Sequence, residues 1–189
     1  RTSDEYGFML LSFLNASNID VKEIEDVIVA SVVPKIMYSF SNSIKKYFNK
    51  EPIIIGPGIK TGIRIKIDNP KELGADRLVD AAGAYYIYGG SCLVIDFGTA
   101  TTFDVVDENG DFLGGATAPG IGISINALSS QAAKLPEIEI KKPKNVIAKN
   151  TVSSMQAGII HGYVGLTENI IRTIKKEYGK DLKVISTGG

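Results

Sequence analysis

Cysteine is almost absent from this sequence, which contains only Cys92. A single cysteine cannot form a disulfide within the chain, so a disulfide-stabilised secreted fold is excluded and a cytoplasmic protein is expected. Cys92 lies inside the apolar run SCLVIDF, which favours a buried structural thiol over a nucleophile. His161 is the only histidine, and without a second histidine or a neighbouring cysteine we expect neither a zinc site nor a catalytic role there.

The chain has no excess of charge of either sign, because 21 basic residues balance 21 acidic ones. A neutral chain lacks the positive field that attracts nucleic acids or anionic membranes, so we expect neither as a partner. Any anionic ligand must therefore be held by local contacts. The length of 189 residues, with 44% hydrophobic and 22% charged residues, fits an ordinary globular protein of one large or two small domains.

Long hydrophobic runs are missing as well. No apolar stretch approaches the roughly 18 residues of a membrane span, and no basic-then-apolar leader opens the chain. The chain begins at Arg1 and stops at two glycines that follow a strand pattern. Both ends are therefore expected to be cut.

Apolar periodicity alternates between strand and helix spacing in the first half of the chain, which predicts a mixed α/β fold. We expect strands at VIVASVV, PIIIG and GIRIKID, and helices at SDEYGFMLLSFLNAS, KIMYSFSNSIKKYF and NPKELGADRLVDAAGAYYIYGG. Ser3 is the expected N-cap of the first helix. In GIRIKID, isoleucines alternate with Arg64 and Lys66, which is typical of a half-exposed strand.

The second half predicts three consecutive antiparallel strands, at SCLVIDF, TTFDVVD and DFLGGATAP, with a tight turn at Asn109-Gly110. Helices are expected at GISINALSSQAAKL and TVSSMQAGIIHGYVGLTENIIRTIKKEYG, and a strand at LKVISTGG. The Gly89-Gly90 pair is the expected domain boundary, which gives lobes of residues 1–90 and 91–189.

The stretch DFGTATTFDVV places an acid, a glycine and three threonines between two apolar runs. A carboxylate at the end of a buried strand can face a cation, and the following amides and hydroxyls can face phosphate oxygens. Such a loop suits a nucleotide–metal complex. An ordinary hairpin rich in β-forming threonines is the alternative reading.

A wider set of motifs resembles one family. A strand ending in Asp-x-Gly-Thr, a hairpin and a second glycine-rich turn resemble the lobes of the acetate and sugar kinase, Hsp70 and actin superfamily. The segments SVVP, GPGIKTG, DNPKELGADR, DFGTATTFD, GGATAPGI, KNTVSSMQAGI and STGG follow the order seen in type III pantothenate kinases. Together they span nearly the whole chain.

This resemblance implies an enzyme that transfers the γ-phosphoryl group of ATP to the 4′-hydroxyl of pantothenate, the first step of coenzyme A biosynthesis. It also implies a duplicated actin-like (ribonuclease H-like) fold with mixed sheets, a homodimer, and dependence on Mg²⁺ and a monovalent cation, K⁺ or NH₄⁺. Two alternatives remain open, namely another small-molecule kinase of the superfamily and a non-catalytic regulatory relative.

The resemblance assigns the GADR segment, residues Gly74, Ala75, Asp76 and Arg77, to pantothenate binding. A positioned carboxylate can accept the proton of an attacking alcohol, which suits Asp76 as catalytic base, and the planar guanidinium of Arg77 can pair with the pantothenate carboxylate. Spacing alone favours another reading, in which Asp76 merely stabilises the helix N-terminus while Arg77 pairs with Asp80 or Asp76 on the surface, and the resemblance reverses that choice.

The remaining assignments also come from the resemblance. It places Gly58, Thr61 and Gly62 of GPGIKTG in the pantothenate pocket, although the loop could also be a plain turn; its glycine spacing fits neither a dinucleotide loop nor a P-loop. Asp96 corresponds to the monovalent-cation ligand, and Gly98 and Thr99 to the nucleotide contact. Thr151 corresponds to a substrate contact, whereas its alternative role is a helix N-cap that competes with Asn150. Gly188 and Gly189 resemble the start of an adenosine-side turn.

The sequence departs from this family in one respect. Members open with a strand and an Asp-x-Gly-Asn-Thr loop for ATP phosphates, and nothing of that kind precedes Arg1. The first lobe is therefore expected to lack its opening strands, the second its C-terminal part, and the chain as given to bind ATP poorly and possess little activity.

Overall fold

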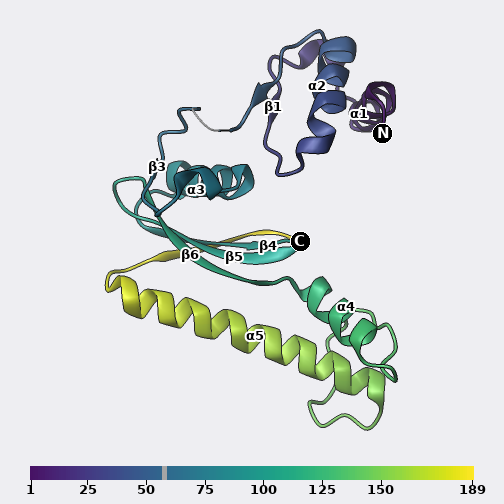
Figure 1. Ribbon diagram of the computed structural model, residues 1–189, viewed down its shortest axis with the longest axis vertical. Helices are drawn as coiled ribbons and strands as arrows, with labels where there is room; N and C mark the ends of the chain where they lie inside the picture. Colours follow the sequence, from purple (N-terminus) through teal and green to yellow (C-terminus); the bar gives the residue numbers. More distant parts are fainter. Residues whose placement is uncertain (57–58) are drawn as a thin grey trace. The chain divides into compact units, whose positions relative to one another are not determined.

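The computed structural model describes residues 1–56 and 59–189. The chain divides into two compact units (Figure 1). The N-terminal unit comprises Arg1–Thr61 and Lys71–Val79, and the C-terminal unit comprises Gly62–Pro70 and Asp80–Gly189. In the described part of the chain, no helix combines the length and apolar character that a bilayer span requires.

The N-terminal unit contains the helices α1 (Ser3–Ala16) and α2 (Pro34–Phe48) and a two-stranded parallel sheet of β1 (Ile28–Val29) and β2 (Ile53–Ile54). The prediction of Ser3 as N-cap is wrong, because Thr2 caps α1: its hydroxyl accepts from the Glu5 N–H, and the Glu5 carboxylate accepts from the Thr2 N–H.

The strand predicted at VIVASVV is also shorter than expected. It ends at Val29 because the chain bends at Val32 before Pro34, which occupies the first turn of α2. Proline is favoured there because its fixed φ suits the helix and its missing N–H would be unpaired anyway.

The C-terminal unit is built on a five-stranded mixed sheet in the order β3-β6-β5-β4-β7. Its strands are β3 (Arg64–Ile65), β4 (Cys92–Phe97), β5 (Ala100–Val106), β6 (Asp111–Pro119) and β7 (Lys183–Gly188). The three predicted consecutive antiparallel strands are confirmed as β4, β5 and β6, whereas β7 pairs with β4 in parallel. A mixed α/β fold is thus confirmed; the duplication of lobes and the boundary at Gly89-Gly90 stay predictions.

The edge strand β3 shows the predicted half-exposure. Ile63, Ile65 and Ile67 are partly buried, while Arg64 and Lys66 are exposed. The predicted turn at Asn109-Gly110 is confirmed too: Gly110 has φ +75°, and the Asp107 carboxylate accepts from the Asn109 N–H at 2.8 Å. An aspartate that bonds backbone two residues on stabilises such a turn.

Three helices accompany this sheet: α3 (Ala75–Tyr88), α4 (Ile121–Gln131) and α5 (Thr151–Tyr178). The helix predicted over NPKELGADRLVDAAGAYYIYGG starts later than expected, because Pro70–Glu72 forms a separate 3₁₀ turn and α3 begins only after Gly74. Residues 75–79 of α3 belong to the N-terminal unit and residues 80–88 to the C-terminal unit.

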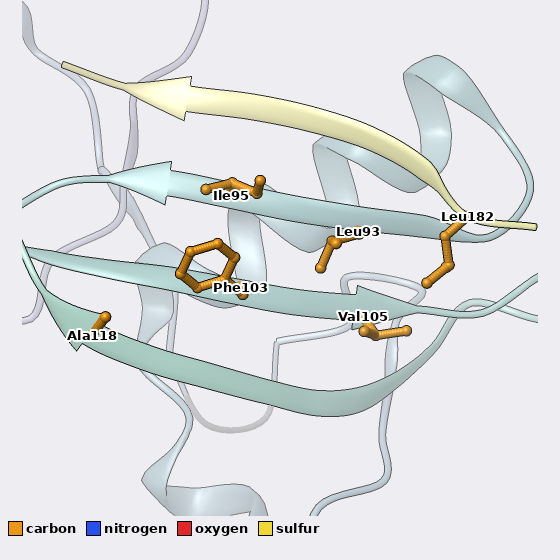
Figure 2. Packing of buried hydrophobic residues seen from close by; sticks show 6 residues of the cluster. All are labelled: Leu93, Ile95, Phe103, Val105, Ala118 and Leu182. Carbon is orange, nitrogen blue, oxygen red and sulfur yellow. The ribbon is translucent and has the colours of Figure 1, made fainter. Parts of the chain in front are cut away.

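The core of the C-terminal unit lies on the sheet face that α5 covers (Figure 1), and Figure 2 shows its buried side chains. Leucine, isoleucine, valine and phenylalanine side chains from β4 and β5 meet Ile170, Ile171 and Ile174 of α5. The buried cluster consists of Leu93, Ile95, Phe103, Val105, Ala118 and Leu182. The opposite face packs Cys92 and Val94 against Ala84 of α3, and burial raises the pKa of the Cys92 thiol, as expected for a structural cysteine.

Glu108 ties the C-terminal end of α5 to the β5–β6 turn. Its carboxylate accepts from Lys180 Nζ at 2.6 Å, from the Tyr178 hydroxyl at 2.9 Å and from Ser91 Oγ at 3.0 Å. These donors favour the ionised form, and the pKa of Glu108 falls from its usual 4.5 to about 2, with Lys180 as the largest cause.

We expect Glu108→Gln to lower the Tm at pH 7 by a small amount, because the carboxylate is solvent-exposed and its ion pair is screened. Because folding lowers the pKa of Glu108, its ionised carboxylate stabilises the native state above pH 4.5. This stabilisation is lost as the pH falls toward 2 and the carboxylate becomes protonated. The difference in Tm between wild type and variant should therefore shrink between pH 5 and 2 in calorimetric scans. The exposed Glu137→Gln is the control, and a pH-independent difference contradicts the prediction.

Candidate functional site

The loop between β4 and β5 is fixed by backbone hydrogen bonds from neighbouring segments. The Gly98 N–H donates to Ala100 O at 3.1 Å and closes the loop on itself. The Gly120 N–H, at the end of β6, donates to Thr99 O at 3.0 Å, and the Gly189 N–H, after β7, donates to Phe97 O at 3.0 Å. The ends of β6 and β7 thus meet the loop of residues Asp96–Thr99, which we call the DFGT loop, at one end of the sheet.

Three glycines leave the backbone around this loop bare. A Cβ atom on Gly188, whose φ is +84°, would lie 2.4 Å from Asp96 Oδ1, and one on Gly120 would lie 2.4 Å from both Gly98 O and Thr99 O. A Cβ on Gly98 would lie 3.4 Å from Asp96 Oδ2. Side chains at Gly120 and Gly188 would collide with the loop or with the Asp96 carboxylate, whereas the distance at Gly98 is an ordinary contact.

The strand register places Asp96 in a row of oxygen-bearing side chains across four strands. Asp96 pairs with Thr187 of β7 on one side and with Thr102 of β5 on the other, and Thr102 pairs with Thr117 of β6. Directly paired residues project from the same face of a sheet. The row Thr187–Asp96–Thr102–Thr117 therefore offers one carboxylate and three hydroxyls beside the loop.

Thr102 is the member of this row that suggests a ligand. The residue is only 9% exposed, and its Oγ1 atom has no hydrogen-bond partner within residues 1–56 and 59–189. A buried hydroxyl without a partner is costly. Carboxylate and hydroxyl oxygens are ligands for hard cations, so Asp96 and Thr102 suit a monovalent cation or a partly hydrated Mg²⁺.

The described residues contain no cluster of three acidic, histidine or cysteine side chains that could hold a metal by itself. A divalent ion at this edge would need oxygens from a ligand, as Mg²⁺ commonly does when it binds one or two carboxylates together with substrate phosphates. Asp96 and the bare loop are consistent with that arrangement.

The GADR segment lies at the start of α3, in the N-terminal unit. Asp76 is exposed, and its Oδ1 atom accepts from the Arg77 N–H at 2.8 Å. The same oxygen would lie 2.5 Å from a Cβ atom on Gly74, so glycine there makes room for the carboxylate. Ala75 is the first residue of α3, and the Gly74 carbonyl accepts from the Leu78 N–H at 3.1 Å.

This contact shows Asp76 bonded to a backbone amide at the helix N-terminus, as the alternative structural reading expected. The bond uses Oδ1, and the side chain is exposed. The capping contact of Asp76 through Oδ1 is compatible with proton transfer to its other oxygen, Oδ2.

Of the GPGIKTG residues, Gly58 lies outside the described part of the chain. Thr61 is partly buried in the connection between β2 and β3. Gly62 has φ +80°, and a Cβ atom there would lie 1.7 Å from the Tyr86 hydroxyl of α3, so this position requires glycine unless Tyr86 moves. Thr61 belongs to the N-terminal unit and Gly62 to the C-terminal unit.

Thr151 is the first residue of α5, but the N-cap is Asn150, whose side chain accepts from the Ser153 N–H at 2.9 Å. The alternative role of Thr151 as N-cap is therefore excluded. Thr151 instead lines a cavity of about 610 Å³ between α4 and the start of α5. Its walls are apolar at Leu128, Leu135 and Met155, with Asn150, Thr151 and Ser154 as polar lining.

Sequence reasoning missed several residues of this edge. Thr102, Thr117 and Thr187 join Asp96 only through strand pairing, and Gly120 approaches the loop only through the fold. Asp104 is a buried carboxylate on the same sheet face as Asp96, 3% exposed. An acid within the apolar run TTFDVV was the signal that could have identified it.

Two comparisons with known proteins identify the same family. Residues 1–173 match the family described as type III pantothenate kinase. A type III pantothenate kinase of Agathobacter rectalis is 59% identical over 190 residues, covering 100% of this chain and 73% of the relative. A solved structure of a Campylobacter jejuni protein, named as a Baf family transcriptional activator, covers 89% of this chain and 71% of its own with TM-score 0.54 and 19% identity. That last likeness concerns the fold alone.

Proposed function

The chain belongs to the type III pantothenate kinase family, and we propose that its DFGT loop binds ATP phosphates while Asp76 activates the acceptor hydroxyl. The family assignment makes it a kinase that phosphorylates pantothenate in coenzyme A biosynthesis, with ATP as the phosphoryl donor. The observation that carries the proposal is the unpartnered Thr102 hydroxyl beside Asp96 at a glycine-lined sheet edge.

Gly98 and Thr99 face the phosphate end of the nucleotide in this proposal. Gly120 lies against their backbone, where a side chain would collide with both carbonyl oxygens. The Thr99 side chain is exposed and can donate its hydroxyl hydrogen to a phosphate oxygen. Positioned donors of this kind stabilise the charge of a transferring phosphoryl group.

Asp96 and Thr102 hold the cation in this proposal, and their oxygens suit K⁺ or NH₄⁺. Mg²⁺ and the monovalent cation, when bound, neutralise the phosphate charge. Protein residues supply few ligands to Mg²⁺, in keeping with the absence of a three-carboxylate cluster among the residues described.

Asp76 accepts the proton of the pantothenate 4′-hydroxyl as that oxygen attacks the γ-phosphorus and the bond to the departing ADP oxygen breaks. Its exposed carboxylate, oriented by the Arg77 amide, is available for this transfer. The Arg77 guanidinium binds the pantothenate carboxylate, and Gly74 and Ala75 shape the turn that presents both side chains. Thr61, Gly62 and Thr151 contribute further pantothenate contacts, as does Gly58.

We also place the enzyme in the cytoplasm as a homodimer. The family resemblance motivates the dimer, and the lone buried cysteine suits a reducing compartment. Analytical ultracentrifugation measures the oligomeric state directly, and a monomer at micromolar concentration would contradict the dimer.

The cation site is tested by Asp96→Asn in the complete enzyme. We expect kcat to rise with K⁺ at constant ionic strength in the wild type, and the variant to lose most of this rise, with kcat lower by about tenfold. The reason is that an amide oxygen carries no net charge to attract the ion, whereas general screening would not distinguish K⁺ from Na⁺. Steady-state rates at increasing K⁺, with Na⁺ making up the ionic strength, provide the measurement.

The control is Asp181→Asn, which removes an exposed carboxylate of the same unit. It should retain full K⁺ activation. Equal K⁺ activation in the wild type and Asp96→Asn means that Asp96 does not bind the ion.

A further inference from the structure

Tyr163, near the middle of α5, bonds two strands at once. Its hydroxyl donates to Pro119 O at 3.3 Å and is hydrogen-bonded to Thr101 Oγ1. Thr101 is fully buried, and Tyr163 is partly buried. Because the Tyr163 hydrogen is directed to the carbonyl, the Thr101 hydroxyl donates to the Tyr163 oxygen. The two bonds join α5 to the second residue of β5 and the last residue of β6.

Both strand positions lead directly into the DFGT loop. Thr101 lies two residues after Thr99, and Pro119 precedes Gly120, whose N–H holds the Thr99 carbonyl. Ala100 and Pro119 are paired across β5 and β6, as are Thr101 and Ala118. The Tyr163 hydroxyl therefore fixes the start of β5, which follows the Gly98–Thr99 backbone, and the end of β6, which precedes the residue that bonds Thr99 O.

Tyr163 is held firmly enough to perform this role. Its ring lies 6.5 Å from the Phe97 ring, which belongs to the last residue of β4. The same helix packs Leu166, Ile170 and Ile174 against the sheet core. A tyrosine on a packed helix loses little further freedom when its hydroxyl bonds.

We propose that Tyr163 is a positioning residue for ATP, which holds the Gly98–Thr99 loop in the geometry that binds phosphate. The inference rests on the proposed role of that loop. In this role Tyr163 acts through its bonds to Thr101 and Pro119. Its loss therefore affects ATP far more than pantothenate.

The test is Tyr163→Phe in the complete enzyme, because this change removes the hydroxyl and keeps the ring beside Phe97. We expect the KM for ATP to rise about three- to tenfold, the range that one net hydrogen bond supplies. The KM for pantothenate should change little. Steady-state kinetics with each substrate varied in turn separate the two constants.

Tyr178→Phe is the matched control. It removes a tyrosine hydroxyl from the same helix. The partners of that hydroxyl are Ser91 and Glu108, and neither belongs to the DFGT loop. We expect the KM for ATP to stay at the wild-type value in this variant. An equal rise in both variants shows a general effect of loosening α5 and overturns the proposal.

Amide hydrogen exchange gives a second readout that does not depend on turnover. Tyr163→Phe should speed exchange in the segment 97–101 and at Gly120, whose amides form the loop bonds, whereas Tyr178→Phe should not. Unchanged exchange in that segment together with an unchanged KM for ATP overturns the proposal even if the variant melts at a lower temperature.

Thr99→Val distinguishes failure of this inference from failure of the proposed function. If Thr99→Val raises the KM for ATP and Tyr163→Phe does not, the loop binds ATP and the positioning role alone is wrong. If Thr99→Val leaves the KM for ATP unchanged, the loop is not the phosphate contact, and both proposals fall. A rise in both variants, absent in Tyr178→Phe, supports the inference.

Discussion

Asp76→Asn is expected to retain pantothenate binding and to lose on the order of 10²–10⁴ in kcat, the usual weight of a general base. The asparagine can still accept the Arg77 N–H through its amide oxygen, so the contact at 2.8 Å and the helix start are preserved. What the variant lacks is a group that can take the hydroxyl proton. Steady-state kinetics and calorimetric titration with pantothenate measure the two quantities.

Asp26→Asn serves as the control, because Asp26 is an exposed carboxylate of the same unit. It should keep wild-type kcat and pantothenate affinity. Near wild-type turnover of Asp76→Asn would leave Asp76 with the capping role alone. If the variant lost both pantothenate binding and turnover, the carboxylate would instead orient the substrate.

The β4–β5–β6 sheet could be predicted from the sequence because its signals are local. Apolar runs of strand length and an Asn-Gly turn define each strand and its neighbour without knowledge of the rest of the fold. The edge character of β3 was equally visible in its alternation of isoleucine with Arg64 and Lys66. Helix starts were harder: Thr2 and Ser3 are both good N-caps, and only the reciprocal bond with Glu5 decides between them.

The candidate site was predictable only in part. The motif pointed to Asp96, Gly98 and Thr99 because all three lie within four consecutive residues of the chain. The row from Thr187 to Thr117 depends on the pairing of four strands, and β7 lies far from β4 in sequence. Tyr163 is separated from Pro119 by 44 positions and from Thr101 by 62, so no local pattern could connect them. Long-range register decides such contacts.

Gly120→Ala is expected to reduce kcat/KM for ATP by about 10²-fold, because a misplacement near 1 Å at a reacting site has an effect of that order. The new Cβ atom would lie 2.4 Å from both Gly98 O and Thr99 O and 2.9 Å from Thr99 C. These are backbone atoms, so the overlap cannot be relieved by rotating a side chain. The loop must move away from β6, and the bond from the Gly120 N–H to Thr99 O must lengthen or break.

Gly122→Ala provides a close comparison, since Gly122 lies two residues later, in the first turn of α4, and a Cβ atom there would meet nothing within 4 Å. Alanine also suits a helix better than glycine, so this variant should be as stable as the wild type or more so. The Gly120 variant should show a raised KM for ATP, with pantothenate affinity by calorimetric titration close to that of the wild type. A folded Gly120→Ala protein with unchanged kinetics for ATP would mean that the DFGT loop tolerates the displacement. Phosphate binding would then have to depend on other parts of the protein.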